Sequence, residues 1–335
     1  MNSSGENAAQ PLLAVENLRT RLLTRRGLVS VVDGVTFTVH SGQTFGIVGE
    51  SGCGKSMLCK TLLRLLPRTA QVAPDADILL DGRPIQGLSE KALNRIRGKE
   101  IAMVFQNPMA SLNPVMTVGA QVAEPLRRHL DMASAPARLR AAALLATVGI
   151  PLPKKSLDQF PHQMSGGMRQ RVAIAMAVAA YPRLLIADEP TTALDVTVQA
   201  DILDLLDHIQ QERRMAMILV THDLALVACR AHEVAVMYAG KIVERADTAS
   251  LFKQPRMPYT RALLDARPRL GNPAHMPLST INGRPPDLIR PLSGCRFAPR
   301  CPRMRKRCKL EEPVLCADAE GTHRYACWYP LGGRA

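Results

Sequence analysis

The sequence predicts an α/β fold built on a mainly parallel sheet. Three apolar segments of strand length, 44–48, 184–187 and 215–221, stop at a glycine-rich loop, an acidic pair and a histidine, respectively. Continuous apolar runs are typical of strands buried on both faces, and polar residues at their carboxyl ends are typical of sites in open parallel sheets. Segments of helical period follow the first two runs, as the crossover connections of such a sheet require.

The composition is that of a globular chain. With 335 residues it can form one large domain with an appendage. Hydrophobic residues make up 47% and charged residues 21%, so we expect disorder only in short segments, among them residues 1–12. These first residues lack the pattern of a signal peptide, and the longest apolar run, 172–181, is about half of a membrane-spanning helix. We therefore expect neither export nor membrane crossing by the chain itself.

A phosphate-binding motif follows the first buried strand. Residues 13–48 are β-rich, and a helical pattern runs from the motif to near Pro67. The loop between them has the spacing G-x-x-x-x-G-K-S, in which backbone N–H groups and a helix N-terminus converge on phosphate oxygens. Lys55 would neutralise the β- and γ-phosphates, and Ser56 would hold Mg²⁺. The predicted ATP-binding residues are Gly49, Glu50, Ser51, Gly52, Cys53, Gly54, Lys55, Ser56 and Asp188.

Two further strand ends carry candidate catalytic residues. Asp188 follows the strand 184–187 and suits Mg²⁺, while Glu189 beside it can polarise the attacking water. An acidic pair alone is more often a solvated turn. His222 ends the third apolar run, where its side chain would face the same crevice, although a lone histidine is most often structural. Residues 233–246 then read as a hairpin that turns at Ala239 and Gly240.

With these motifs in order, residues 13–266 resemble the ATP-binding subunit of an ABC transporter. The segment "QMSGGMRQR" resembles the family's signature, Gln106 its Q-loop glutamine, 193–195 its D-loop and His222 its switch histidine. The resemblance implies a P-loop NTPase of ABC type with a β-rich subdomain, a RecA-like core and a helical insert at about 108–162. It gives catalytic roles to Glu189, His222 and Gln106, and adds Gln106 to the Mg²⁺ ligands. The residues that would face the ATP of the partner subunit are Ser165, Gly166, Gly167 and Asp195.

The sequence departs from the family in the segment expected to stack on the adenine base of ATP. Members carry an aromatic residue near the start of the domain, whereas "LRTRLLTRRG" offers Arg21 and Leu22. A guanidinium can stack on a purine and leucine can pack against it. The signature also reads MSGGM, with Met168 in place of an amide.

The C-terminal residues 267–335 read as an extension with a cysteine cluster. The segment "PYTRALL" and the tail resemble the dipeptide, oligopeptide and nickel branch of importers, and a Pro-rich connector at 281–294 precedes the cysteines. Five to ten residues separate successive cysteines with no CxxC pair, which argues against zinc and suits a [4Fe–4S] cluster beside several arginines. The resemblance implies Cys295, Cys301, Cys308 and Cys327 as its ligands, whereas Cys316 matches none. A structural zinc site and uncoordinated thiols are the alternatives.

The resemblance implies an ATPase that powers import of di- or oligopeptides. It would lie on the cytoplasmic face of a bacterial inner membrane with two permease subunits, a second ATPase subunit and an extracytoplasmic solute-binding protein. The net charge of +14 keeps an alternative open, a soluble ABC ATPase acting on nucleic acid or ribosomes. We expect no nucleic acid, because the basic residues are scattered and the chain has neither tandem ATPase domains nor a long coiled coil. Regulation of the ATPase by the cluster is a third possibility.

Overall fold

The computed structural model describes residues 10–107, 111–192, 194–266, 280–289 and 292–332. The chain divides into two compact units, and each is described here by itself. The first unit takes in Met1–Val15, Phe37–Gln43 and Asp77–Ile218. The second takes in Glu16–Thr36, Thr44–Ala76 and Leu219–Ala335. Leu12 is buried in the first unit, and its carbonyl accepts a hydrogen bond from the Asp81 N–H at 2.7 Å. Residues 1–9 of the predicted leader lie outside the described residues.

The first unit combines short strands with a layer of helices. Its strands are β5 (Asp77–Leu80), β6 (Arg83–Pro84), β7 (Ile101–Val104) and β8 (Leu184–Asp188). Its helices are α2 (Glu90–Ile96), α4 (Val118–Leu130), α5 (Ser134–Thr147), α6 (Pro153–Ser156), η1 (Pro161–Gln163), α7 (Gly166–Val178) and α8 (Val196–Arg213). Strands β7 and β8 pair in parallel, with Ile101 opposite Leu184, and β9 (Ala216–Thr221), which has residues in both units, follows β8 in the strand order. The predicted strand 184–187 is confirmed, and the segment "IAMVFQ" (101–106), whose sequence also predicts a strand, forms one over Ile101–Val104.

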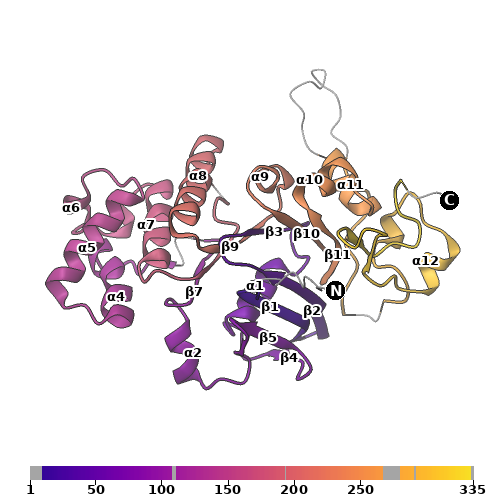
Figure 1. Cartoon of the computed structure of the whole chain (residues 1–335), viewed down its shortest axis with the longest axis horizontal. Coiled ribbons are helices and arrows are strands. Elements are labelled where there is room, and N and C mark those ends of the chain that lie inside the picture. The colour runs from indigo at the N-terminus through magenta and orange to yellow at the C-terminus, as the bar shows by residue number, and fades with distance from the viewer. Residues whose placement is uncertain (1–9, 108–110, 193, 267–279, 290–291, 333–335) are drawn as a thin grey trace, which may run out of the picture. The chain divides into compact units, whose positions relative to one another are not determined.

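The helices of the predicted insert form one group in the first unit. Figure 1 shows α4, α5 and α6 gathered beside α7, and these helices pack on one another. Thr117 caps α4 and Ser165 caps α7, each by accepting a hydrogen bond from a backbone N–H of the first turn. The helices at 118–130 and 134–147 confirm the helical period of the sequence there. Residues 108–110, where the insert was expected to begin, lie outside the described residues.

The second unit holds the β-rich start and the C-terminal residues. Its strands are β1 (Leu13–Thr24) and β2 (Gly27–Val39), each of which has a few residues in the first unit, β3 (Thr44–Val48), β4 (Ala70–Val72), β10 (Glu233–Tyr238), β11 (Lys241–Asp247), β12 (Cys316–Ala317) and β13 (Arg324–Tyr325). Its helices are α1 (Lys55–Leu62), α9 (Leu224–Ala228), α10 (Thr248–Lys253), α11 (Pro258–Asp265), η2 (Ala298–Arg300) and α12 (Lys306–Leu310).

The sheet of the second unit runs β12-β13-β11-β10-β3 and continues to β9. Strands β3 and β10 pair in parallel, and every side chain of β3 is buried, as the apolar run 44–48 predicts. The predicted hairpin is also confirmed, because β10 and β11 are antiparallel and Ala239 and Gly240 both have positive φ, as a primed turn requires. The helix α1 ends at Leu62, earlier than expected, since Arg64 adopts the left-handed conformation.

Candidate functional site

The phosphate-binding loop connects β3 to α1 within the second unit. Its glycines allow other backbone segments to lie against the loop. A Cβ at Gly54 would lie 2.2 Å from the Val31 carbonyl oxygen, and the φ of Gly54, 109°, also favours glycine. A Cβ at Gly49 would lie equally close, 2.2 Å, to the Met237 carbonyl oxygen. Only glycine fits at these two positions, so the loop follows a path that the motif's spacing dictates.

The loop has the chemistry that a phosphate group needs. Helix α1 starts after Gly54, which has no side chain to cap the first turn, so its backbone N–H groups suit an anion. The ammonium of Lys55 lies at this helix start, where it donates to the carbonyl oxygens of Gly49 at 2.8 Å and Glu50 at 3.1 Å. Ser51 and Gly52 are exposed, so the backbone of the loop is accessible to solvent there. The side chain of Lys55, which carries the positive charge, is buried.

Gly52 and Gly54, which both have positive φ, provide a matched pair for a stability prediction. Gly54→Ala is expected to lower the free energy of unfolding by about 3 kcal/mol or more, because a left-handed alanine must also displace the Val31 carbonyl. Gly52→Ala is expected to cost only about 1 kcal/mol, since a Cβ at Gly52 meets nothing within 4 Å. Thermal or denaturant unfolding of the two variants measures the difference. Equal losses would contradict the loop geometry.

The acidic pair and the Q-loop glutamine lie together in the first unit. Asp188 ends β8 with its side chain buried, and Glu189 follows with a φ of 45°, which turns its side chain away from the strand direction. The Glu189 Oε2 atom accepts hydrogen bonds from Gln106 Nε2 at 2.9 Å and from the hydroxyl of Thr192, also at 2.9 Å. The structure thus brings two predicted catalytic residues, 83 positions apart, into direct contact. Thr192 is a third residue of this hydrogen-bonded group, and the sequence analysis did not predict it.

The predicted signature residues begin a helix in the first unit. Ser165 caps α7 by accepting a hydrogen bond from the Met168 N–H at 3.2 Å. A Cβ at Gly167 would lie 2.8 Å from Cγ1 of Val198, so this glycine lets the start of α7 approach α8. Asp195 caps α8 through the Val198 N–H at 2.9 Å. The N-termini of α7 and α8 therefore lie close together here, and each carries the positive end of a helix dipole. Ala193 of the predicted D-loop lies outside the described residues.

His222 belongs to the second unit, where it follows β9 with an exposed side chain. Its neighbour Asp223 caps the short helix α9 by accepting from the Ala225 N–H at 2.7 Å. The predicted site residues thus fall into two sets. Gly49–Ser56 and His222 are in the second unit, and the acidic pair, Gln106 and the signature are in the first. That they act on one nucleotide stays a prediction.

The prediction of an iron–sulfur cluster at Cys295, Cys301, Cys308 and Cys327 is wrong. Among the described residues, no group of three or more histidine, cysteine, aspartate or glutamate side chains is placed to hold a metal ion. This finding also removes the zinc alternative. The eight cysteines are free thiols. The four in question line a cavity of about 10 Å³, which is room for about one water molecule and too little for a cluster.

The four thiols lie in a partly buried environment. Burial raises the pKa of the Cys295 and Cys301 thiols and raises that of Cys327 to about 11. Two of the arginines expected to offset a cluster's charge have other partners. The Arg305 guanidinium lies 4.3 Å from the Tyr329 ring centroid, and that of Arg307 lies 3.5 Å from the Trp328 ring centroid.

Burial also disfavours the thiolate of Cys53, which lies in the loop beside Lys55. Burial raises the pKa of Cys53, and the nearby Lys55 ammonium offsets this only in part. Only 5% of Cys53 is exposed, whereas Cys229 and Cys316 are exposed.

Alkylation rates test this pattern. At pH 8, iodoacetamide is expected to modify Cys316 and Cys229 at least about tenfold faster than Cys327, because a pKa of about 11 leaves roughly one thiolate in a thousand. The rate at Cys327 should rise about tenfold for each pH unit up to pH 10, since its thiolate fraction grows with pH. Peptide mass spectrometry of the native protein measures both. Fastest modification at Cys53 or Cys327 would contradict the burial described here.

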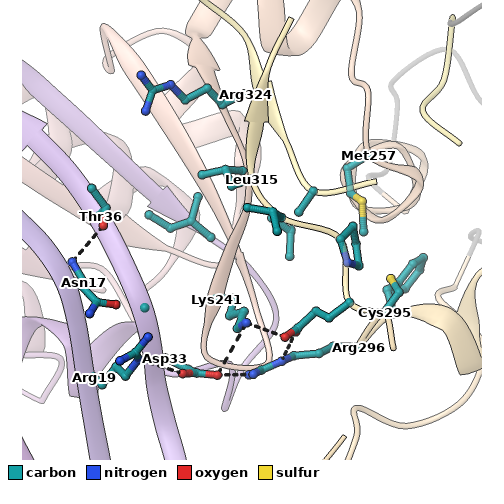
Figure 2. Close-up of a pocket in the computed structure, with 18 residues that line it drawn as sticks. Asn17, Arg19, Asp33, Thr36, Lys241, Met257, Cys295, Arg296, Leu315 and Arg324 are labelled. Carbon is teal, nitrogen blue, oxygen red and sulfur yellow. Dashed lines mark hydrogen bonds and ion pairs between the residues drawn. The ribbon is translucent and has the colours of Figure 1, made fainter. Parts of the chain in front are cut away.

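A network of ion pairs lies beside the cysteines in the second unit. Figure 2 shows Lys241 and Arg296 converging on the Asp33 carboxylate, with Arg19 also 3.6 Å from it. Burial alone would raise the pKa of Asp33, but the hydrogen bond and charge of Arg296 hold it below its usual value. The network borders a cavity of about 450 Å³.

Comparisons with known proteins agree with the motifs. The ABC transporter family matches residues 32–192, and the family described as "Oligopeptide/dipeptide transporter, C-terminal region" matches 243–308. The dipeptide transport ATP-binding protein DppD of Bacillus subtilis is 47% identical over 320 residues, covering 95% of both chains. DppD of Escherichia coli is 45% identical over 320 residues, covering 96% of this chain and 97% of its own. OppD of Bacillus subtilis, an oligopeptide transport ATP-binding protein, is 46% identical and covers 95% of this chain and 88% of its own.

Solved structures show the same fold. The chain superposes on the dimeric structure of a post-hydrolysis state of an ATP-binding cassette bound to ADP and Pi, with a TM-score of 0.63 and 26% identity. The match covers 70% of this chain and 98% of that one.

The chain belongs to the ABC transporter family, as one of its ATP-binding proteins, and has the α/β fold of a P-loop NTPase. It is an ATPase, and ATP and Mg²⁺ are its expected ligands. Within the family it belongs to the branch of the dipeptide and oligopeptide transport ATP-binding proteins. No helix in the described part of the chain combines the length and apolar character needed to span a bilayer.

Proposed function

We propose that this chain powers the import of dipeptides or oligopeptides by hydrolysing ATP. The similarity to named peptide transport proteins covers nearly the whole chain, including 243–308, and the Gln106–Glu189 hydrogen bond supports the catalytic part. The alternative, an ATPase acting on nucleic acid or ribosomes, is not favoured, because these relatives carry names of transport proteins. Direct measurement of solute uptake, described in the Discussion, tests the proposal.

The proposed chemistry assigns each motif a role on one of two bound nucleotides. The loop N–H groups and the Lys55 ammonium bind the phosphates, and Ser56, Asp188 and Gln106 would hold Mg²⁺, which neutralises charge on the β- and γ-phosphates when bound. Glu189 accepts a proton from the attacking water, and Gln106 and Thr192 orient its carboxylate. His222 contacts the γ-phosphate. Ser165, Gly166, Gly167 and Asp195 serve the ATP of the other subunit.

The proposed assembly follows from the single set of motifs in the chain. One chain supplies one phosphate-binding loop and one signature, so two ATPase subunits would enclose two nucleotides, as the dimeric relative suggests. The partner would be a second, homologous ATPase subunit. Two permease subunits would carry the solute, and an extracytoplasmic solute-binding protein would deliver it. The chain would be peripheral on the cytoplasmic face of the inner membrane, and residues 267–335 would form a C-terminal extension of the ATPase domain.

A further inference from the structure

The phosphate-binding loop has a partner that the function described so far does not use, the buried guanidinium of Arg300. Arg300 lies in the C-terminal residues, 250 positions after Glu50, and only 3% of its side chain is exposed. Its Nη1 atom donates to Glu50 Oε2 at 2.6 Å, and Nη2 donates to Oε1 at 2.9 Å. This is the bidentate geometry of a strong charge-assisted pair. The hydrogen bond to Glu50 raises the pKa of Arg300 above its ordinary value.

All five N–H donors of Arg300 are used. Besides Glu50, they reach the Tyr238 hydroxyl at 3.3 Å and the carbonyl oxygens of Ile281 at 3.1 Å and Asn282 at 2.9 Å. A lysine could not satisfy this set, because its ammonium has three donors and no planar fork. The site is therefore built for arginine, and its one charged acceptor belongs to the loop.

Glu50 is held at its main chain as well. Its backbone N–H donates to the Tyr259 hydroxyl at 2.9 Å, and burial keeps that phenol neutral by raising its pKa. Tyr259 packs with Tyr238 at 4.5 Å between ring centroids, and Phe297, three residues before Arg300, contacts both rings. The Glu50 carbonyl in turn accepts from the Lys55 ammonium at 3.1 Å. Glu50 thus connects Arg300 of the C-terminal residues to Lys55 of the phosphate-binding loop.

Residues 296–300 are also connected, through the hairpin turn, to the phosphate-binding loop near its C-terminal end, at Cys53. Arg296 pairs with Asp33 (Figure 2). It also donates to Glu312 at 2.8 Å and to the Ala239 carbonyl at 2.5 Å. The next residue, Gly240, donates its N–H to the carbonyl of Cys53 at 2.9 Å. Residues 296–300 therefore reach Glu50 directly and Cys53 through the hairpin turn, so they restrain the loop at both ends.

We propose that Arg300 is a positioning residue for ATP, which holds the phosphate-binding loop in its binding geometry through Glu50. The proposal rests on the function proposed above for that loop. A loop that is already ordered loses less conformational freedom on binding, so ATP affinity is higher. Arg300 touches neither nucleotide nor catalytic residue in this account. Its loss should therefore raise the Kd for MgATP and leave kcat at saturating ATP within about twofold.

A double-mutant cycle with MgATP as the probe tests the proposal. Arg300→Lys and Glu50→Gln are each expected to raise the Kd about tenfold, which corresponds to about 1.4 kcal/mol. The double variant should bind within about threefold of the weaker single variant, because both changes break the same pair. Arg305→Lys is the matched control, since Arg305 stacks on Tyr329 in the same segment, and it should leave the Kd unchanged.

Three outcomes overturn the proposal. These are a Kd for Arg300→Lys within twofold of the wild type, penalties that multiply in the double variant, or a fall in kcat with an unchanged Kd. Should Arg300→Lys fail to fold, Glu50→Gln decides alone, because the amide keeps the shape of the carboxylate without its charge. The variant Lys55→Met distinguishes a failure of this proposal from a failure of the phosphate-binding function proposed for the loop. If Lys55→Met binds MgATP like the wild type, the assigned function of the loop fails, whereas an effect of Lys55→Met without one of Arg300→Lys refutes only the role of Arg300.

Discussion

Replacing Glu189 with glutamine is expected to lower ATP turnover by about 10²- to 10⁴-fold, the contribution typical of a general base. Glutamine keeps the size and one acceptor oxygen of glutamate, so the hydrogen bonds from Gln106 and Thr192 can persist. It cannot accept a proton from water. We therefore expect the Kd for MgATP to change less than about threefold, and the ATP-bound subunits to accumulate as a stable dimer.

Steady-state hydrolysis, equilibrium binding and size-exclusion chromatography with ATP together test this prediction. Glu124→Gln is a matched control, because Glu124 is an exposed carboxylate on α4 of the same unit, and it should hydrolyse ATP like the wild type. The account fails if Glu189→Gln keeps more than about a tenth of the wild-type rate, or if its loss of turnover reflects lost ATP binding.

The second large effect is expected at Lys55. Lys55→Met keeps a long unbranched side chain but removes the ammonium that lies at the start of α1, so the phosphates lose their nearest fixed positive charge. A hydrogen bond to a charged group contributes about 1.5–3 kcal/mol, which predicts a Kd for MgATP raised by about 10- to 150-fold.

Lys60→Met is the control for Lys55, because Lys60 lies in the last turn of the same helix. Its affinity for MgATP should equal that of the wild type. Calorimetric titration measures both variants, and circular dichroism confirms that they fold. Equal affinities for Lys55→Met and the wild type would show that the loop is not the phosphate site.

The sequence predicted the parts of the fold that have a local signal. The strand at 44–48 is a continuous apolar run between a turn and a glycine-rich loop, and the hairpin turn at Ala239 and Gly240 separates two β-rich segments. The strands β12 and β13 have two residues each, too few for a period, so their addition to the sheet beside β11 could not be predicted.

The site was predictable to the extent that its motifs are contiguous. The loop residues 49–56 carry their spacing in the sequence, and the role of Gln106 came from a family resemblance. The contact of Gln106 with Glu189 was not predicted and is seen only in the structure. The Arg300–Glu50 pair joins residues 250 positions apart and has no spacing signal. The cysteine prediction, which used spacing, neighbouring charge and a family resemblance, failed, and the burial of the thiols is a property of the fold alone.

Uptake of labelled peptides tests the central claim most directly. The cells that carry this sequence would receive Glu189→Gln at the native locus, and uptake of a panel of labelled di- and oligopeptides would be compared with that of unmodified cells and of Glu124→Gln cells. The account predicts that Glu189→Gln abolishes ATP-dependent uptake of the peptides that this importer carries and that Glu124→Gln does not. Unchanged uptake of every peptide in the panel, with loss of uptake of a different solute, would contradict it.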